Sequence, residues 1–182
     1  MRVLGISGSL RRDSHNTELL RAAATLLPSG VEFELYDGLR DIPPYDEDES
    51  QVAAVLDLKE RIAAADAVLF ATPEYNHSIP GHLKNALDWV SRPLADTPLK
   101  GKPVAVIGAS TGMFGAVWAQ AELRKVLGAI GARVLDRELP VPMADEIVRD
   151  PEKLESSGTH SLIVGILAEL LEAARPLAAA AA

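Results

Sequence analysis

The amino-acid sequence predicts an α/β protein built on a five-stranded parallel sheet with helices on both faces. Two observations carry this prediction. Five segments with the apolar pattern of β-strands alternate along the chain with five segments of helical periodicity. Three of the strand segments are short and mainly apolar throughout, which is typical of strands that crossover helices bury on both faces. In such sheets the crossovers are right-handed, and ligands bind beyond the carboxyl ends of the strands.

The first third of the chain predicts a strand, a helix and an edge strand. Residues 3–7 form an apolar run, and the leucines and alanines of 19–27 recur at helical spacing until Pro28 ends the helix. Residues 31–36 alternate between apolar and polar side chains, which predicts an edge or half-buried strand. Residues 37–50 are rich in Asp, Glu and Pro, and this composition predicts a long surface loop.

The middle of the chain adds two buried strands and two helices. A helix is predicted over 51–65, because its large apolar residues share one face. The apolar run 67–71 predicts a strand, and a polar loop with two prolines leads from it to a helix over 81–90. After a loop that Gly101 closes, residues 104–108 predict another buried strand.

The last third of the chain predicts one more strand between two helices. A helix over 116–130 ends at Gly131, and the last strand covers 133–136. Residues 140–151 predict a loop, and 161–174 form a strongly amphipathic helix.

The composition excludes several classes of function. The formal net charge is −8 at pH 7, which argues against a nucleic-acid partner because nucleic-acid-binding surfaces are basic. The chain has no cysteine, so disulfides, thiolate–zinc sites and cysteine nucleophiles are excluded, and any redox function needs a bound cofactor. His77 and His82, the closest of the four histidines, are five residues apart and do not share a helix face, so no metal site is expected.

We expect a single cytoplasmic domain over residues 1–182. The first predicted strand follows Met1 almost at once, so no signal peptide is expected. No apolar run approaches the ~20 residues of a membrane span, so no membrane partner is expected. The chain has neither an internal repeat nor a linker, and only its alanine-rich tail, from about residue 176, is expected to be disordered.

Three polar loops leave the carboxyl ends of the first, third and fourth predicted strands, so we expect them to converge on one site. The first loop runs from Gly8 into a helix N-terminus, which offers free backbone N–H groups and a positive dipole end. It also carries hydroxyl side chains and a guanidinium that suit a phosphate group. These candidates are Ser9, Arg11, Ser14 and Thr17. An N-capping loop with solvated charges explains the same residues, and both interpretations stay open from this stretch alone.

Two better-known phosphate loops do not match this stretch. A Walker loop places Lys and then Ser or Thr after a glycine, and neither follows here. A dinucleotide fingerprint needs three glycines at fixed spacing, whereas only Gly5 and Gly8 are present. Asp37, at the end of the second predicted strand, could nevertheless take the part of the ribose-binding acid of that motif.

The second and third loops favour a flat ligand. In the second, Pro73 stiffens a backbone whose amides could bond the edge of a heterocycle, and Tyr75 offers a stacking face, unless it is only a surface anchor of a turn. The third, 108–112, matches the nucleophile elbow of hydrolases, with Ser110 as the nucleophile. The histidine that such a triad needs is His160, with Asp136 or Asp145 as the acid, but nothing places His160 near Ser110. We therefore favour a loop that closes over a planar ligand.

Taken together, these motifs resemble the NAD(P)H-dependent FMN reductase family of flavodoxin-like proteins, which includes chromate and quinone reductases. The resemblance covers residues 3 to about 142. The matching stretches are 8–11 with Ser14 and Asn16, 73–76, 81–89 and 115–124. Ala116 departs from the pattern, because many members of the family have a second glycine there.

The resemblance implies a flavodoxin-like, three-layer, doubly wound fold with the strand order 2-1-3-4-5 and with FMN as the cofactor. By this resemblance the FMN phosphate is held by Ser9, Arg11, Ser14, Asn16 and Thr17. The isoalloxazine ring is lined by Pro73, Glu74, Tyr75 and Asn76. Its pyrimidine end is closed by Ser110, Thr111, Gly112 and Gly115. Three residues of the following helix are expected to be structural: Lys84, Asn85 and Asp88.

The implied reaction is a ping-pong hydride transfer through bound FMN, from NADPH or NADH to a small-molecule acceptor such as a quinone, a free flavin or a metal oxyanion. The flavin carries the chemistry, so no side chain is predicted to be catalytic. The resemblance also implies a homodimer or homotetramer. Two alternatives are a flavodoxin-like electron carrier that does not itself oxidise NAD(P)H and a serine hydrolase that uses Ser110.

Overall fold

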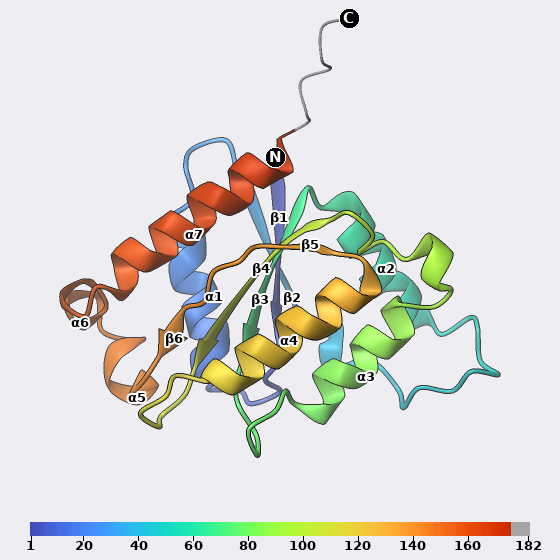
Figure 1. The fold of residues 1–182 in the computed structure, drawn as a ribbon, viewed down its shortest axis with the longest axis horizontal. Helices are drawn as coiled ribbons and strands as arrows, with labels where there is room; N and C mark the ends of the chain where they lie inside the picture. The colour runs from blue at the N-terminus through green and yellow to red at the C-terminus, as the bar shows by residue number, and fades with distance from the viewer. Residues whose placement is uncertain (176–182) are drawn as a thin grey trace, which may run out of the picture.

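A parallel sheet in the order β2-β1-β3-β4-β5 forms the centre of the computed structural model, which describes residues 1–175 (Figure 1). This is the predicted order, with the addition of a short sixth strand that pairs with β4. The strands are β1 (Arg2–Ser7), β2 (Glu32–Tyr36), β3 (Ala67–Thr72), β4 (Pro103–Ala109), β5 (Arg133–Val134) and β6 (Pro140–Val141). The predicted disordered tail lies outside the described residues.

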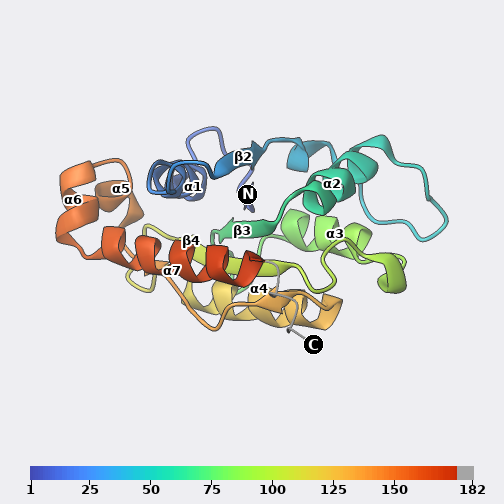
Figure 2. The same ribbon diagram turned by 90° about the horizontal axis from the view of Figure 1, so that it is seen from above.

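Helices cover both faces of the sheet, as the alternating pattern predicts. Figures 1 and 2 show α1, α5, α6 and α7 towards one side of the sheet, and α2 and α3 towards the other. The helices are α1 (His15–Thr25), α2 (Ala53–Ala64), α3 (Gly81–Val90), α4 (Val117–Ile130), α5 (Ala144–Ile147), α6 (Pro151–Ser156) and α7 (Thr159–Ala174). Two 3₁₀ turns, η1 (Gly38–Asp41) and η2 (Leu94–Asp96), lie in the connections.

Two separate apolar cores hold these layers together. Every residue of β3 is buried, and successive side chains of a strand point to opposite faces. Phe70 therefore packs in the core beneath α2, α3 and α4, whereas its neighbour Leu69 packs in the core beneath α1 and α7. This two-sided burial explains why the central strands are apolar throughout.

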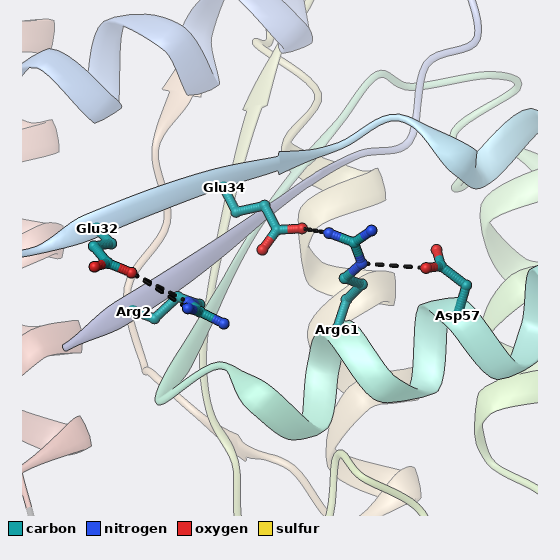
Figure 3. Close-up of polar contacts among 5 residues, drawn as sticks. All are labelled: Arg2, Glu32, Glu34, Asp57 and Arg61. Atoms are coloured by element: carbon teal, nitrogen blue, oxygen red, sulfur yellow. Dashed lines mark hydrogen bonds and ion pairs between the residues drawn. The ribbon is translucent and has the colours of Figure 1, made fainter.

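The edge strand β2 is only partly buried, and its charged residues form ion pairs (Figure 3). Arg2 lies 3.4 Å from Glu32. Arg61 of α2 bonds Glu34 and lies 3.2 Å from Asp57 on its own helix. Exposed pairs of this kind are screened by water and contribute little to stability. Charged side chains along an edge strand also oppose pairing with another chain.

The far edge of the sheet differs from the prediction. The strand predicted over 133–136 ends at Val134, and the loop predicted over 140–151 contains β6 and α5. Arg133 pairs with Pro103, and Pro140 pairs with Gly108. From the first pair to the second, the edge segment runs seven residues along the chain, whereas β4 runs only five. Two extra residues therefore loop out between β5 and β6. The reason is the charge of this segment, since Asp136 and Glu138 turn outward and pair with Arg124 of α4.

Gln120 bonds the backbone where the edge of the sheet is interrupted between β5 and β6. Its side chain is completely buried on α4. The side-chain Oε1 accepts a hydrogen bond from the Leu139 N–H at 3.0 Å, and Nε2 donates to the Gly115 carbonyl at 3.1 Å. One amide thus satisfies a backbone group in the turn before α4 and another directly before β6, and it holds β6 beside β4.

The remaining boundaries follow the sequence pattern closely. The helices predicted over 51–65, 81–90, 116–130 and 161–174 are present with ends shifted by two residues or fewer. The first helix stops at Thr25, two residues before the predicted end. None of the helices within residues 1–175 has the length and apolar character that a membrane span requires.

We predict that Gln120→Leu destabilises the protein by about 2–4 kcal/mol, because it leaves two buried backbone groups without partners. Urea unfolding followed by circular dichroism measures this free energy. Glu122→Gln, on the exposed side of the same helix, is the control and should change it by less than about 0.5 kcal/mol. A Gln120→Leu variant as stable as the parent would show that the bridge contributes nothing.

Candidate functional site

The loops that follow β1, β3 and β4 meet at the carboxyl edge of the sheet, at the bottom of Figure 1, and enclose a cleft. Nine of the predicted site residues line it together: Ser9, Arg11, Ser14, Asn16, Pro73, Glu74, Tyr75, Ser110 and Thr111. His15 and Ala109 line it as well. The other predicted residues, Thr17, Asn76, Gly112 and Gly115, lie outside this lining. The three loops thus converge as the parallel sheet predicts.

The first loop presents the N-terminus of α1 to the cleft. Ser14 caps the helix, and its hydroxyl accepts a hydrogen bond from the Thr17 N–H at 3.2 Å. The amides of His15 and Asn16 precede the first intrahelical bond, so a helix gives them no acceptor of its own. Together with the dipole end, they favour an anion beside Ser9 and Arg11. Thr17 lies outside the cleft lining, and its hydroxyl donates to Ser7 Oγ at 2.9 Å.

The Asn16 side chain joins the first loop to the third. It is buried, and both of its amide atoms bond the backbone of Ala109, 93 residues away. Nδ2 donates to the Ala109 carbonyl at 2.9 Å, and Oδ1 accepts from the Ala109 N–H at 2.9 Å. The side chain therefore fixes the spacing of the two loops through its amide oxygen and one of its two N–H donors.

His15 is a residue of the cleft that sequence reasoning missed. Its Nδ1 is buried and has no hydrogen-bond partner among residues 1–175. Buried polar atoms nearly always have a partner, so this nitrogen indicates a place for a ligand or a water molecule. The sequence did contain a signal for His15, because its imidazole lies between the predicted site residues Ser14 and Asn16, in the first turn of an anion-favouring helix.

The second loop is a tight turn with Tyr75 beside the cleft. Tyr75 and Ser78 exchange backbone hydrogen bonds at 3.0 and 3.1 Å. Asn76 and His77 between them adopt left-handed backbone conformations, with φ of 54° and 60°. Asn76 thus occupies the exposed tip of the turn rather than the wall of the cleft. The Tyr75 side chain is about half exposed, which leaves its ring accessible to a flat ligand.

Glu74 connects the second loop to α4. Its largely buried carboxylate accepts hydrogen bonds from the Trp118 and Ala119 N–H groups, at 3.1 and 3.2 Å. The helix needs this contact, because its N-cap residue, Ala116, has φ of +62° and makes no side-chain capping bond. Glu74 therefore lines the cleft, and its negatively charged carboxylate caps the N-terminus of α4.

The third loop is held by β6. The Ser110 N–H donates to the Val141 carbonyl at 3.1 Å, and the Ala144 N–H donates to the Ser110 carbonyl at 3.1 Å. Gly115 has φ of +57°, and a Cβ added to it would lie 2.5 Å from the Val141 nitrogen. A side chain would therefore push the loop off β6. Gly112 also supports the loop, since its N–H donates to Ser110 Oγ at 3.1 Å.

The structure does not assemble the hydrolase triad that the sequence left as an alternative. His160 lies on α7 and lines a separate groove with residues of α1 and α6, whereas Ser110 lines the cleft. Asp136 is fully exposed and pairs with Arg124. Within residues 1–175, no group of three or more His, Asp or Glu side chains is placed to hold a metal ion.

The predicted structural residues of α3 make their contacts away from the cleft. Asn85 accepts from the Tyr45 N–H at 2.7 Å and donates to the Pro43 carbonyl at 2.7 Å, which fixes the long loop before α2. Lys84 lies 2.6 Å from Asp88, one turn further along the helix.

Comparison with known proteins identifies the relatives of this chain. The family model described as NADPH-dependent FMN reductase matches residues 1–146. The chain is 49% identical to the NAD(P)H-dependent FMN reductase PA1204 of Pseudomonas aeruginosa over 140 residues, which are 75% of each chain. It is 41% identical to a quinone reductase of Escherichia coli K12 over 141 residues, which are 75% of this chain and 74% of that protein.

A solved structure shows the same likeness over most of the length. FerB, a flavoenzyme NAD(P)H:(acceptor) oxidoreductase from Paracoccus denitrificans, matches with a TM-score of 0.76 and 37% sequence identity. The match covers 92% of this chain and 97% of that chain. The strand order 2-1-3-4-5 is that of flavodoxin-like folds, so the predicted fold is confirmed.

We predict that Asn16→Asp destabilises the protein by about 2 kcal/mol, because the carboxylate cannot donate to the Ala109 carbonyl and faces it with a negative charge. Thermal unfolding of the protein without added ligand measures the change. Asn76→Asp, at the exposed tip of the second loop, is the matched control and should leave the midpoint within experimental error. Equal midpoints for the two variants would contradict the role of the Asn16 side chain.

Proposed function

This chain belongs to the NADPH-dependent FMN reductase family, and on that premise we propose that it binds FMN in the cleft and passes hydride from NADPH or NADH to a small-molecule acceptor. The observation that carries the proposal is the convergence of an anion-favouring helix N-terminus, an exposed aromatic ring and a Ser/Thr loop on one cleft. A phosphate and a flat ring system are the two parts of FMN that such a cleft needs to bind.

The phosphate end of the cleft fits a phosphomonoester. We assign its oxygens to the amides of the first turn of α1 and to the side chains of Ser9, Arg11 and Ser14. His15 lines the same cleft, and its buried Nδ1 has no hydrogen-bond partner among residues 1–175, which supports this assignment. In this arrangement Asn16 and Thr17 position the loop through Ala109 and Ser7.

The ring end of the cleft fits a planar heterocycle. Pro73 and Tyr75 of the second loop line the cleft, as do the polar residues Ser110 and Thr111 of the third. Glu74, Gly112 and Gly115 act indirectly in this proposal, because their bonds and close contacts set the positions of the loops. Asn76 forms the turn that presents Tyr75.

FMN, when bound, supplies the chemistry of accepting a hydride and releasing electrons to an acceptor. The residues of the chain bind and orient it, and none of them is needed as a general acid or base. One cleft serves both half-reactions, which favours a ping-pong order in which the oxidised donor leaves before the acceptor enters. The E. coli relative is a quinone reductase, so a quinone is our first candidate acceptor.

The finer sequence-based expectations stay predictions. They are a cytoplasmic location, activity on free flavin or on chromate and other metal oxyanions, and a homodimer or homotetramer. Exposed apolar side chains support a homo-oligomer, because Met113 and Phe114 of the third loop and Trp118 of α4 are exposed, and the Phe114 and Trp118 rings lie 5.0 Å apart. A second copy of the chain covering them would remove apolar area from water.

We predict that Arg11→Ala weakens FMN binding by about 10- to 100-fold, because it removes the one guanidinium that lines the cleft among residues 1–175. Quenching of flavin fluorescence during titration of the apoprotein measures the dissociation constant. Arg12→Ala is the control, since the Arg12 side chain is exposed and does not line the cleft. Equal affinities for both variants would remove Arg11 from the phosphate site.

We further predict that the FMN-loaded protein oxidises NADPH or NADH when benzoquinone is the acceptor. Absorbance at the nicotinamide band follows the reaction, and the yellow flavin spectrum reports occupancy. Flavin binding without oxidation of either donor would favour the alternative of a flavodoxin-like electron carrier. A colourless protein labelled at Ser110 by a fluorophosphonate would favour a hydrolase instead.

A further inference from the structure

Aromatic side chains from the second loop and from α4 gather beside the cleft. Trp118, in the first turn of α4, packs edge to face against His77 at the tip of the second loop, with the ring centroids 4.8 Å apart and the planes at 86°. The indole also packs against the Phe114 ring, 5.0 Å away. Tyr75, two residues before His77, lines the cleft itself. We call Tyr75, His77 and Trp118 the aromatic rim.

Glu74 joins the aromatic rim to the cleft. Its side chain belongs to the cleft lining, and one carboxylate oxygen, Oε2, accepts a hydrogen bond from the Trp118 N–H at 3.1 Å. The other oxygen, Oε1, lies 3.5 Å from His77 Nδ1. Two members of the rim therefore contact a residue of the lining, and the third, Tyr75, is in the lining. The aromatic rim thus continues the ring end of the cleft.

The rim combines accessible aromatic surface with a fixed backbone. Trp118 is 42% exposed and Tyr75 is 47% exposed, although both carry large rings. The backbone bonds between Tyr75 and Ser78 hold the turn that contains His77, and the bond to Glu74 holds the backbone of Trp118. Aromatic side chains have few rotatable bonds, so a surface that is already in place binds a flat ligand at a low cost in conformational entropy.

We propose that the aromatic rim binds the part of an electron acceptor that extends beyond the cleft, and that it makes the protein selective for acceptors with two or more fused rings. The proposal rests on the proposed function, since it needs an acceptor that reacts at a flavin in the cleft. The second ring of a naphthoquinone adds a flat apolar surface, and packing it on the rim removes apolar area from water. A single-ring benzoquinone lacks this surface. Inorganic acceptors such as ferricyanide are anions without an apolar face and gain no such contact.

Steady-state kinetics of the FMN-loaded protein at saturating NADPH or NADH tests this selectivity. The parent should show a KM for 1,4-naphthoquinone about tenfold lower than for 1,4-benzoquinone. Trp118→Ala should raise the KM for naphthoquinone about tenfold and that for benzoquinone less than threefold, and Trp118→Phe should restore most of the loss. His77→Asn, which suits the left-handed backbone at this position, should raise the naphthoquinone KM about threefold. Leu94→Ala removes a similarly exposed apolar side chain from η2, outside the cleft lining, and as the matched control should change neither KM.

Calorimetry on the oxidised, FMN-loaded protein without a donor measures acceptor binding apart from turnover. Naphthoquinone should bind the parent about tenfold more tightly than benzoquinone, and Trp118→Ala should remove this difference. Because the chain has no cysteine, neither quinone is lost by addition to a thiol of the protein.

Equal affinities of the parent for the two quinones, or equal KM increases for both in Trp118→Ala, would overturn the proposal. A higher KM for the nicotinamide donor with an unchanged naphthoquinone KM would assign the rim to the donor and would also overturn it. So would a change of oligomeric state in Trp118→Ala, seen by analytical ultracentrifugation, with acceptor selectivity unchanged, because the rim would then belong to a contact with a second copy. Failure of the proposed function is distinguishable, because the protein would retain no flavin or would oxidise the donor with neither quinone.

Discussion

The cleft depends above all on the reciprocal hydrogen bonds between the Asn16 side chain and the Ala109 backbone. They tie the first turn of α1 to the end of β4, and in the sheet β3 lies between β4 and β1, the strand that leads into α1. Both bonds are buried, so breaking either one leaves a polar group with neither a protein partner nor water to bond. The bond pair fixes how far the anion-favouring helix end lies from the loop that closes the other side of the cleft.

A second set of contacts fixes that closing loop. Gln120 holds β6 against the sheet, and Gly115 lets the backbone of the loop approach β6 without a Cβ in the way. Glu74 then caps α4 from the second loop, so the position of the helix and the position of the Tyr75 wall are linked. The site is therefore held by side chains that bond the backbone of distant loops rather than by the loops themselves.

The sequence was sufficient for those features that depend on local pattern. Apolar runs and helical periodicity located the strands and helices, and the parallel topology brought the three polar loops together. The pattern could not reveal β6, because Pro140–Val141 is too short to carry a periodicity and gains its place from Gln120, twenty residues earlier. The pattern also could not distinguish the role of Ser9, which lines the cleft, from that of Asn16, whose side-chain amide bonds Ala109. Both are polar residues of one loop, and their hydrogen-bond partners are known only once the fold is known.

The central claim is that the N-terminus of α1 and the loop around it form the phosphate half of a flavin site. Comparing the affinities of the apoprotein for FMN and for riboflavin tests it most directly, since the two ligands share the ring and differ by the phosphate. The account predicts that FMN binds at least about 100-fold more tightly, because the phosphate gains charge-assisted bonds to Arg11 and the helix amides. Equal dissociation constants for the two flavins would contradict it.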